Sequence, residues 1–194
     1  MSVLCAAMGV MHLRRNAFDS RTAGLALART IGRGGLRPPT LQTIAKEANT
    51  GVSTLHRWFG GTQEMLPHAT AAFADMFWTR VADRVNATGW AGFLPENEDD
   101  LFFLRAWLGF EELARSDDGV GQAVGELWHD ARFWFRSVIG RELTDFELAG
   151  VEAILRGLWD GLCAAEPLDD GLARRLWDAA YTSLVEVSSD AAAA

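Results

Sequence analysis

The chain has 194 residues, of which 49% are hydrophobic and 23% are charged, so it can bury a core and is too apolar for a disordered protein. Its two cysteines, Cys5 and Cys163, are too few for a disulfide-rich secreted domain, and no apolar run reaches the roughly 20 residues of a membrane span. The net charge of −8 argues against nucleic-acid binding by the whole surface, but it is unevenly divided.

The positive charge is concentrated in the first third of the chain. Residues 1–70 carry eight Lys/Arg and three Asp/Glu, whereas residues 71–194 carry ten Lys/Arg and 23 Asp/Glu. This division fits a basic segment that binds nucleic acid, followed by an acidic segment that phosphate repels. A chance asymmetry of surface charge is the alternative.

A first helix is predicted over about residues 19–33, after a flexible N-terminal arm at residues 1–18. Ala23, Leu27 and Ile31 follow one another at helical spacing and form its apolar face. Two glycines at 34–35 end the helix.

A short second helix and a tight turn follow. Thr40 comes after two prolines and can cap a helix whose apolar residues include Ile44 and Ala45. Asn49 and Gly51 then provide the residue types that tolerate positive φ, which a sharp turn between helices requires.

The third predicted helix, about residues 51–58, completes a helix-turn-helix. Leu55 lies where it packs against the preceding helix, which leaves a polar face directed outward. A second helix exposed in this way can lie in the major groove of DNA. Together with the start of the preceding helix, it supplies the predicted DNA contacts Thr40, Gln42, Thr43, Gly51, Val52, Ser53, Thr54, His56 and Arg57.

A fourth, longer helix is predicted to start near Gly61, where Glu64 can complete its cap, and to run well past Phe73. It is predicted to be the only link between the basic and acidic parts. Residues 89–100 contain Gly, Pro and a run of acids, so we expect a loop. We expect the acids to be solvated in this loop and at a helix N-terminus, where acids are favoured, and not to form a metal site.

The rest of the chain also has helical periodicity. Helices are predicted over about 99–115, from 120 to about 142 in one or two pieces, from 144 to about 166, and over 169–187, and no strand is predicted. The predicted fold is all-α: a helix-turn-helix head at residues 19–66, a long connecting helix, and a helical ligand-binding and dimerisation body at 67–188. Residues 189–194 are expected to be a disordered tail.

Three blocks in the head resemble the DNA-binding domain of the TetR family of transcriptional regulators. These blocks are Ile44-Ala45-Lys46-Glu47-Ala48, Thr54-Leu55-His56-Arg57-Trp58-Phe59 and Glu64-Met65-Leu66, within a similarity that extends over about residues 21–77. Asn49 replaces a usual Gly, His56 a usual Tyr, and Thr62 a usual Lys at a backbone-contacting position. Thr62 completes the predicted DNA-contacting set. The departures at His56 and Thr62 remove or weaken backbone contacts, so we expect them to affect DNA affinity more than the fold.

The resemblance implies a homodimer that binds a small molecule in its body. Aromatic residues recur on the central helices, and an aromatic-lined pocket there implies the ligand-binding residues Trp107, Phe110, Trp128, Trp134 and Trp159. Aromatic stripes of this spacing also occur in ordinary cores. The terminal helix pair implies a dimer interface formed by Leu155, Leu158, Leu162, Leu176, Trp177, Ala180 and Leu184.

The resulting hypothesis is a cytoplasmic one-component regulator, a repressor, that binds a palindromic operator as a dimer. A small apolar or aromatic ligand would release it from DNA. The alternative is a helical ligand-binding or scaffold dimer that has lost specific DNA binding. The chain has no phosphate-binding loop, nucleophile elbow or metal-ligand spacing, so we predict no enzyme activity, no cofactor and no metal.

Overall fold

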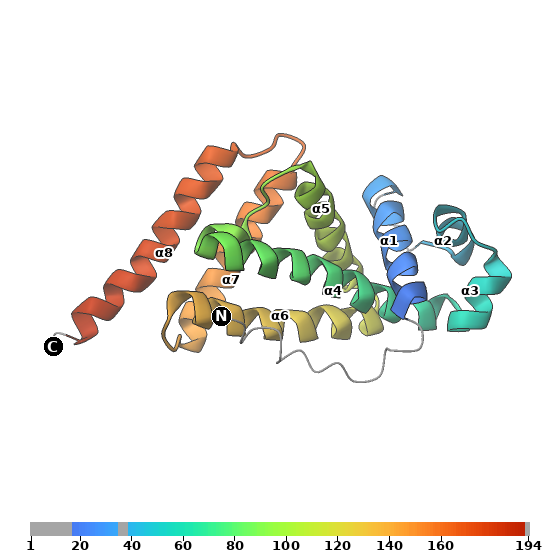
Figure 1. The fold of residues 1–194 in the computed structure, drawn as a ribbon, viewed down its shortest axis with the longest axis horizontal. Coiled ribbons are helices and arrows are strands. Elements are labelled where there is room, and N and C mark those ends of the chain that lie inside the picture. Colours follow the sequence, from blue (N-terminus) through green and yellow to red (C-terminus); the bar gives the residue numbers. More distant parts are fainter. Residues whose placement is uncertain (1–16, 35–38, 193–194) are drawn as a thin grey trace.

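The computed structural model describes residues 17–34 and 39–192, and every element within them is helical (Figure 1). The predicted all-α fold is therefore confirmed, while residues 1–16 of the predicted arm lie outside the described residues. No helix in the described part of the chain is both long and apolar enough to cross a membrane. The elements are α1 (Ala17–Gly34), α2 (Leu41–Glu47), α3 (Val52–Phe59), α4 (Thr62–Thr88), η1 (Gly89–Phe93), α5 (Glu98–Leu113), α6 (Asp118–Ile139), α7 (Asp145–Cys163) and α8 (Asp170–Ala192).

Helix boundaries follow the capping chemistry of the sequence. The Glu64 carboxylate accepts a 2.9 Å hydrogen bond from the Gly61 N–H at the start of α4. Thr144 and Glu147 form a reciprocal capping box at the start of α7. At the other end of the chain, α8 continues past residue 188, where the body was expected to end.

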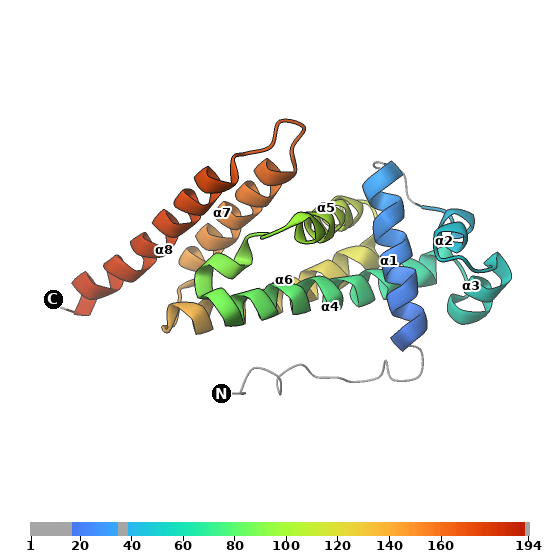
Figure 2. The same ribbon diagram turned by 45° about the horizontal axis from the view of Figure 1, so that its top comes forward.

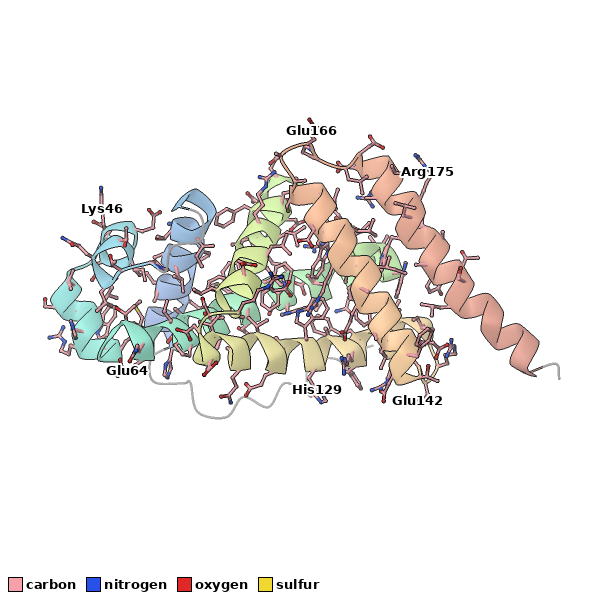
Figure 3. The ribbon with its side chains drawn as sticks, turned by 180° about the vertical axis from the view of Figure 1, so that it is seen from behind. Lys46, Glu64, His129, Glu142, Glu166 and Arg175 are labelled. Atoms are coloured by element: carbon pink, nitrogen blue, oxygen red, sulfur yellow. The ribbon has the colours of Figure 1, made fainter. Side chains whose placement is uncertain are left out.

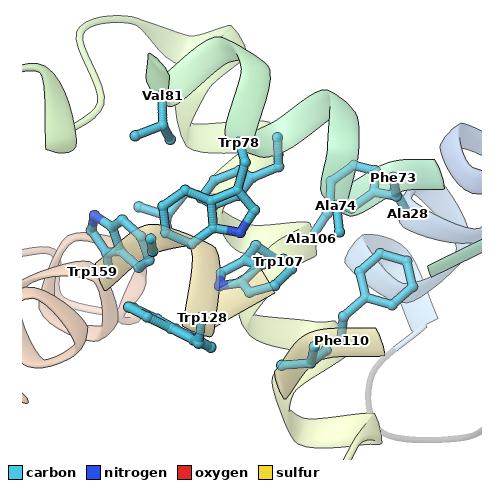
Figure 4. Close-up of a cluster of buried hydrophobic side chains, with 14 of the residues drawn as sticks. Ala28, Phe73, Ala74, Trp78, Val81, Ala106, Trp107, Phe110, Trp128 and Trp159 are labelled. Atoms are coloured by element: carbon cyan, nitrogen blue, oxygen red, sulfur yellow. The ribbon is translucent and has the colours of Figure 1, made fainter. Parts of the chain in front are cut away.

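The centre of the body is an aromatic cluster built around Trp78 of α4 (Figure 4). Its ring lies 5.5–6.0 Å, between centroids, from the rings of four other residues, Trp107, Trp128, Trp134 and Trp159. Three of these pairs are edge-to-face, an arrangement that aromatic rings favour. The cluster joins α4, α5, α6 and α7 into one core.

The predicted loop at residues 89–100 is only partly a loop, because its first half is the 3-10 helix η1. Trp90 of η1 is buried and stacks on Trp177 of α8 with ring centroids 4.1 Å apart. The indole N–H of Trp90 donates to the Trp177 carbonyl at 2.9 Å, and the indole N–H of Trp177 donates to the Trp90 carbonyl at 2.8 Å. This reciprocal pair attaches α8 to the connection between α4 and α5.

In the second half of the same segment the acidic residues are exposed at the start of α5, as predicted, except for Asp100. Asp100 is only 5% exposed and lies at the start of α5. Its carboxylate contacts the guanidinium of Arg84 at 2.8 Å and that of Arg80 at 3.2 Å, and accepts the Glu96 N–H at 3.2 Å. A carboxylate with so little exposure to solvent requires such partners, because a buried charge without a partner is costly.

The head contacts the body at two places, so α4 is not the only link between them. Helix α1 crosses α4 where Gly24 lies against the α4 backbone; a Cβ at Gly24 would be 2.9 Å from the Ala69 carbonyl oxygen. Helix α1 also packs on α5, where a Cβ on Gly109 would collide with the Ile31 side chain. Figure 2 shows α1 running across α4 beside α5.

Candidate nucleic-acid interface

The turn between α2 and α3 has the geometry expected of a helix-turn-helix. Asn49 adopts φ 51°, the only positive φ of a non-glycine residue in the described part of the chain. The Thr50 N–H donates to the Ala45 carbonyl at 2.9 Å and closes the turn. Ile44 of α2 and Leu55 of α3 are at most 1% exposed, so the two helices share a small apolar core.

The opposite face of α3 is open to solvent. Val52 is 39% exposed, Ser53, His56 and Arg57 are also exposed, and Thr54 is half-buried. Helix α3 lies at the extreme end of the molecule in both ribbon views (Figures 1 and 2). The face therefore offers a guanidinium, an imidazole, hydroxyls and an apolar side chain, and no part of the chain that the structure describes covers them. These groups are suited to phosphates, base edges and a thymine methyl.

The predicted contacts at the start of α2 are partly engaged within the protein. Thr40 and Thr43 form a reciprocal cap, in which the Thr43 N–H donates to Thr40 Oγ1 at 3.2 Å and the Thr40 N–H donates to Thr43 Oγ1 at 3.0 Å. Their hydroxyl oxygens are 2.6 Å apart. Gln42 is exposed between them. Gln42 is thus the side chain of this group best able to reach a phosphate.

Gly51 and Thr62 lie at the N-terminal ends of α3 and α4. Gly51 is the exposed N-cap of α3 and provides no side chain to occupy the first backbone N–H groups. Thr62 is the half-buried first residue of α4, two positions before the exposed carboxylate of Glu64. Figure 3 shows Glu64 at the same end of the molecule as Lys46. The start of α4 therefore carries a negative charge and no lysine.

The five aromatic residues proposed to bind a ligand lie in the packed centre of the body. Trp107, Phe110, Trp128 and Trp159 are at most 5% exposed, and Trp134 is half-buried. The four tryptophans pack against Trp78, whereas Phe110 stacks on Phe73. The structure does contain a groove of about 460 Å³, but other residues line it. Trp78 was missed because α4 buries residues on more than one face, so no single apolar stripe marks its buried side.

Polar groups at the edge of this cluster were also missed. The indole N–H of Trp128 donates to the Glu111 carboxylate, and the Arg156 guanidinium lies 4.2 Å from the centroid of the Trp128 ring. Burial raises the pKa of Glu111, although the Trp128 hydrogen bond and the charge of Arg156 oppose this. Only the three-dimensional packing brings these residues of α5, α6 and α7 together.

The predicted dimer residues separate into two groups. Leu155, Leu158, Leu162 and Trp177 are at most 5% exposed and are used in the core of the protomer. Leu176 is 46% exposed, and Ala180 and Leu184 are half-buried. The exposed apolar face of the α7–α8 pair also includes residues that were not predicted: Phe146, Gly150, Ala153, Ile154, Gly157 and Leu172.

Comparison with solved structures identifies proteins of the same fold. A transcriptional regulator from Rhodococcus sp. Rha1 aligns with a TM-score of 0.73 at 15% identity, covering 86% of this chain and 96% of that one. A Rhodococcus protein described as a TetR-family transcriptional regulator gives 0.74 at 16%, covering 86% and 99%. A TetR-family transcriptional regulator from Streptomyces coelicolor gives 0.53 at 16%, covering 86% and 98%. No family model and no curated protein sequence matches the chain. The expected TetR-like fold is thus confirmed.

Proposed function

We propose that this chain, which has the fold of TetR-family transcriptional regulators, is a one-component repressor acting in the cytoplasm. It would bind a palindromic operator as a homodimer and leave it when a small molecule binds. The observation that carries the proposal is the unobstructed outer face of α3 on a closed helix-turn-helix, with Val52, Ser53, His56 and Arg57 exposed.

The chemistry of this face fits a duplex. Arg57 would contact a phosphate or the acceptor edge of a guanine, and Ser53 a phosphate or a base edge. Val52 would contact a thymine methyl. Because residues 71–194 carry a large excess of acids, phosphate repulsion would favour approach through the head.

The exposed face of α7 and α8 supports the dimer. On α7, Gly150, Ala153 and Gly157 recur at helical spacing, and neither glycine has an atom within 4 Å of where its Cβ would lie. Small residues allow another helix to approach closely, while Ile154 and Leu176, each more than 40% exposed, provide apolar area to bury. A second copy turned by two-fold symmetry would cover this face with its own α7 and α8.

DNA recognition is tested by titrating the full chain against fragments of its own genome at several salt concentrations. A regulator should select particular fragments, bind them far more tightly than bulk DNA, and weaken steeply with salt. Arg57→Gln should lower the affinity by roughly tenfold, whereas Arg174→Gln, an exposed arginine of α8, should change it little. Weak, sequence-blind binding would favour the alternative of a ligand-binding or scaffold dimer.

The dimer is tested with a pair of matched alanine substitutions. Ala153 on α7 and Ala87 near the end of α4 are both exposed helical alanines. Ala153→Asp places charges across the proposed two-fold contact and should give monomers in light scattering, whereas Ala87→Asp should leave the dimer intact. A dimer that survives Ala153→Asp would show that the chains pair through another surface.

A further inference from the structure

A groove lies where α1 of the head meets the body. It has a volume of about 460 Å³ and lies between the end of α1, the outer face of α5 and the end of α7. Figure 1 shows α5 between α1 and α7. The apolar lining of the groove includes Ile31, Leu108 and Leu113. A volume of about 460 Å³ is within the range of small-molecule sites.

Two opposite charges at the groove have no ion-pair partner among the residues that the structure describes. Arg115 and Glu112 also line it, but they form an ion pair with each other at 3.1 Å. Arg105 on α5 and Asp160 on α7 make no ion pair with any residue in the part of the chain that the structure describes. The arginine one turn before Asp160, Arg156, points instead to Glu111, at 3.7 Å.

Cys163 lines the groove close to both Arg105 and Asp160. Burial raises the pKa of its thiol to about 11, and both Arg105 and Asp160 are close enough to influence that pKa. The thiol is therefore neutral at physiological pH and contributes an apolar wall. The groove therefore offers an apolar surface flanked by the cation of Arg105 on α5 and the anion of Asp160 on α7.

We propose that this groove binds a small zwitterion with an apolar side group, the chemistry of a free aromatic or branched-chain amino acid. The ligand's carboxylate would pair with Arg105 and its ammonium with Asp160. Its side group would contact Ile31 and Leu108. This arrangement satisfies both unpaired charges and the apolar lining at once, which a purely anionic, cationic or apolar molecule cannot do.

The position of the groove gives it a regulatory consequence, which rests on the proposed function. Ile31 belongs to α1 and packs on α5 at Gly109, so it is both a wall of the groove and part of the contact between head and body. A ligand that contacts Ile31 would make different contacts when the head is oriented differently relative to the body. It would therefore bind one orientation more tightly and shift the equilibrium toward that orientation.

The binding step is tested by calorimetry on the full chain with four related probes. These are L-phenylalanine, 2-phenylethylamine, 3-phenylpropanoate and propylbenzene, which carry both charges, the cation, the anion and neither. Phenylalanine should bind most tightly, and loss of either charge should weaken binding by roughly fivefold, about 1 kcal/mol for a partly solvated ion pair. Equal binding of all four probes, or a preference for a singly charged one, would overturn the proposal.

Substitutions assign each ligand charge to its partner. With Arg105→Gln, phenylalanine and phenylethylamine should bind equally, and with Asp160→Asn, phenylalanine and phenylpropanoate should do so. The exposed α8 variants Arg174→Gln and Asp178→Asn should keep the original order. If the order of affinities among the four probes is unchanged in both groove variants, the probes bind elsewhere, and the pairing of the ligand charges with Arg105 and Asp160 is refuted.

The regulatory step is measured separately, as the operator affinity with and without saturating phenylalanine. Operator binding that weakens in the unmodified chain but not in Arg105→Gln supports the coupling. Phenylalanine bound in the groove with an unchanged operator affinity would refute the coupling and leave the site. Absence of any operator binding would overturn the proposed function, while the calorimetric result would still decide the site.

Discussion

Replacement of Asp100 by alanine should be the most destabilising single change at the junction of α4, η1 and α5. The Asp100 side chain is 4% exposed and pairs with Arg84, whose side chain is 12% exposed, and with Arg80, at 39%. Removing one partner of a buried pair costs about 3–5 kcal/mol, because the remaining charge is buried without compensation. Since Arg80 can be hydrated, we expect about 3 kcal/mol, which lowers the Tm by roughly 6–12 °C in a chain of this size.

The matched control is the neighbouring carboxylate. Asp99 is in the same first turn of α5 but is exposed, so Asp99→Ala should lose only its interaction with the helix dipole, about 0.3–1 kcal/mol. Thermal unfolding followed by circular dichroism measures both variants, and Asp100→Asn should fall between them. If Asp100→Ala unfolds within about 2 °C of Asp99→Ala, the ion cluster does not hold this junction together.

Three further changes probe other parts of the molecule. The pKa of Glu147 is lowered to about 2, chiefly by its hydrogen bond from Arg141. Its stabilising contribution is therefore present above its ordinary pKa of 4.5 and is lost as the pH falls toward 2. The difference in Tm between the unmodified chain and Glu147→Gln should shrink to nothing over that pH range. Gly109→Ala should cost roughly 1–3 kcal/mol by overpacking against α1, whereas Gly125→Ala, which has open space, should stabilise α6 by up to about 1 kcal/mol in urea unfolding. Thr62→Lys should raise operator affinity and steepen the salt dependence by about one, and an unchanged slope would show that the start of α4 does not approach phosphate.

The helix-turn-helix was predictable because its determinants are local. A cap at Thr40, a residue that tolerates positive φ at Asn49 and an apolar anchor at Leu55 are readable from spacing alone, and the structure has each of them in place. Helix starts at Gly61 and Thr144 were predictable for the same reason, since a cap involves residues only three positions apart.

Features that depend on distant packing were not predictable. Trp90 lies in a segment rich in Gly and Pro, and only its pairing with Trp177, 87 positions later, makes that segment part of the core. On α7, apolar residues occupy two faces, so periodicity could not separate Leu155 in the core from Ile154 at the surface. The groove beside Arg105 exists only because three helices converge there.

Two copies of the exposed α3 face should bind DNA together, and footprinting the full chain on the genomic fragment that it binds most tightly tests this directly. We expect two protected half-sites related by two-fold symmetry, with centres about 10–10.5 base pairs, or a multiple of this, apart on one side of the duplex. Uniform coverage without half-sites, or a footprint that Arg57→Gln leaves unchanged, would contradict it.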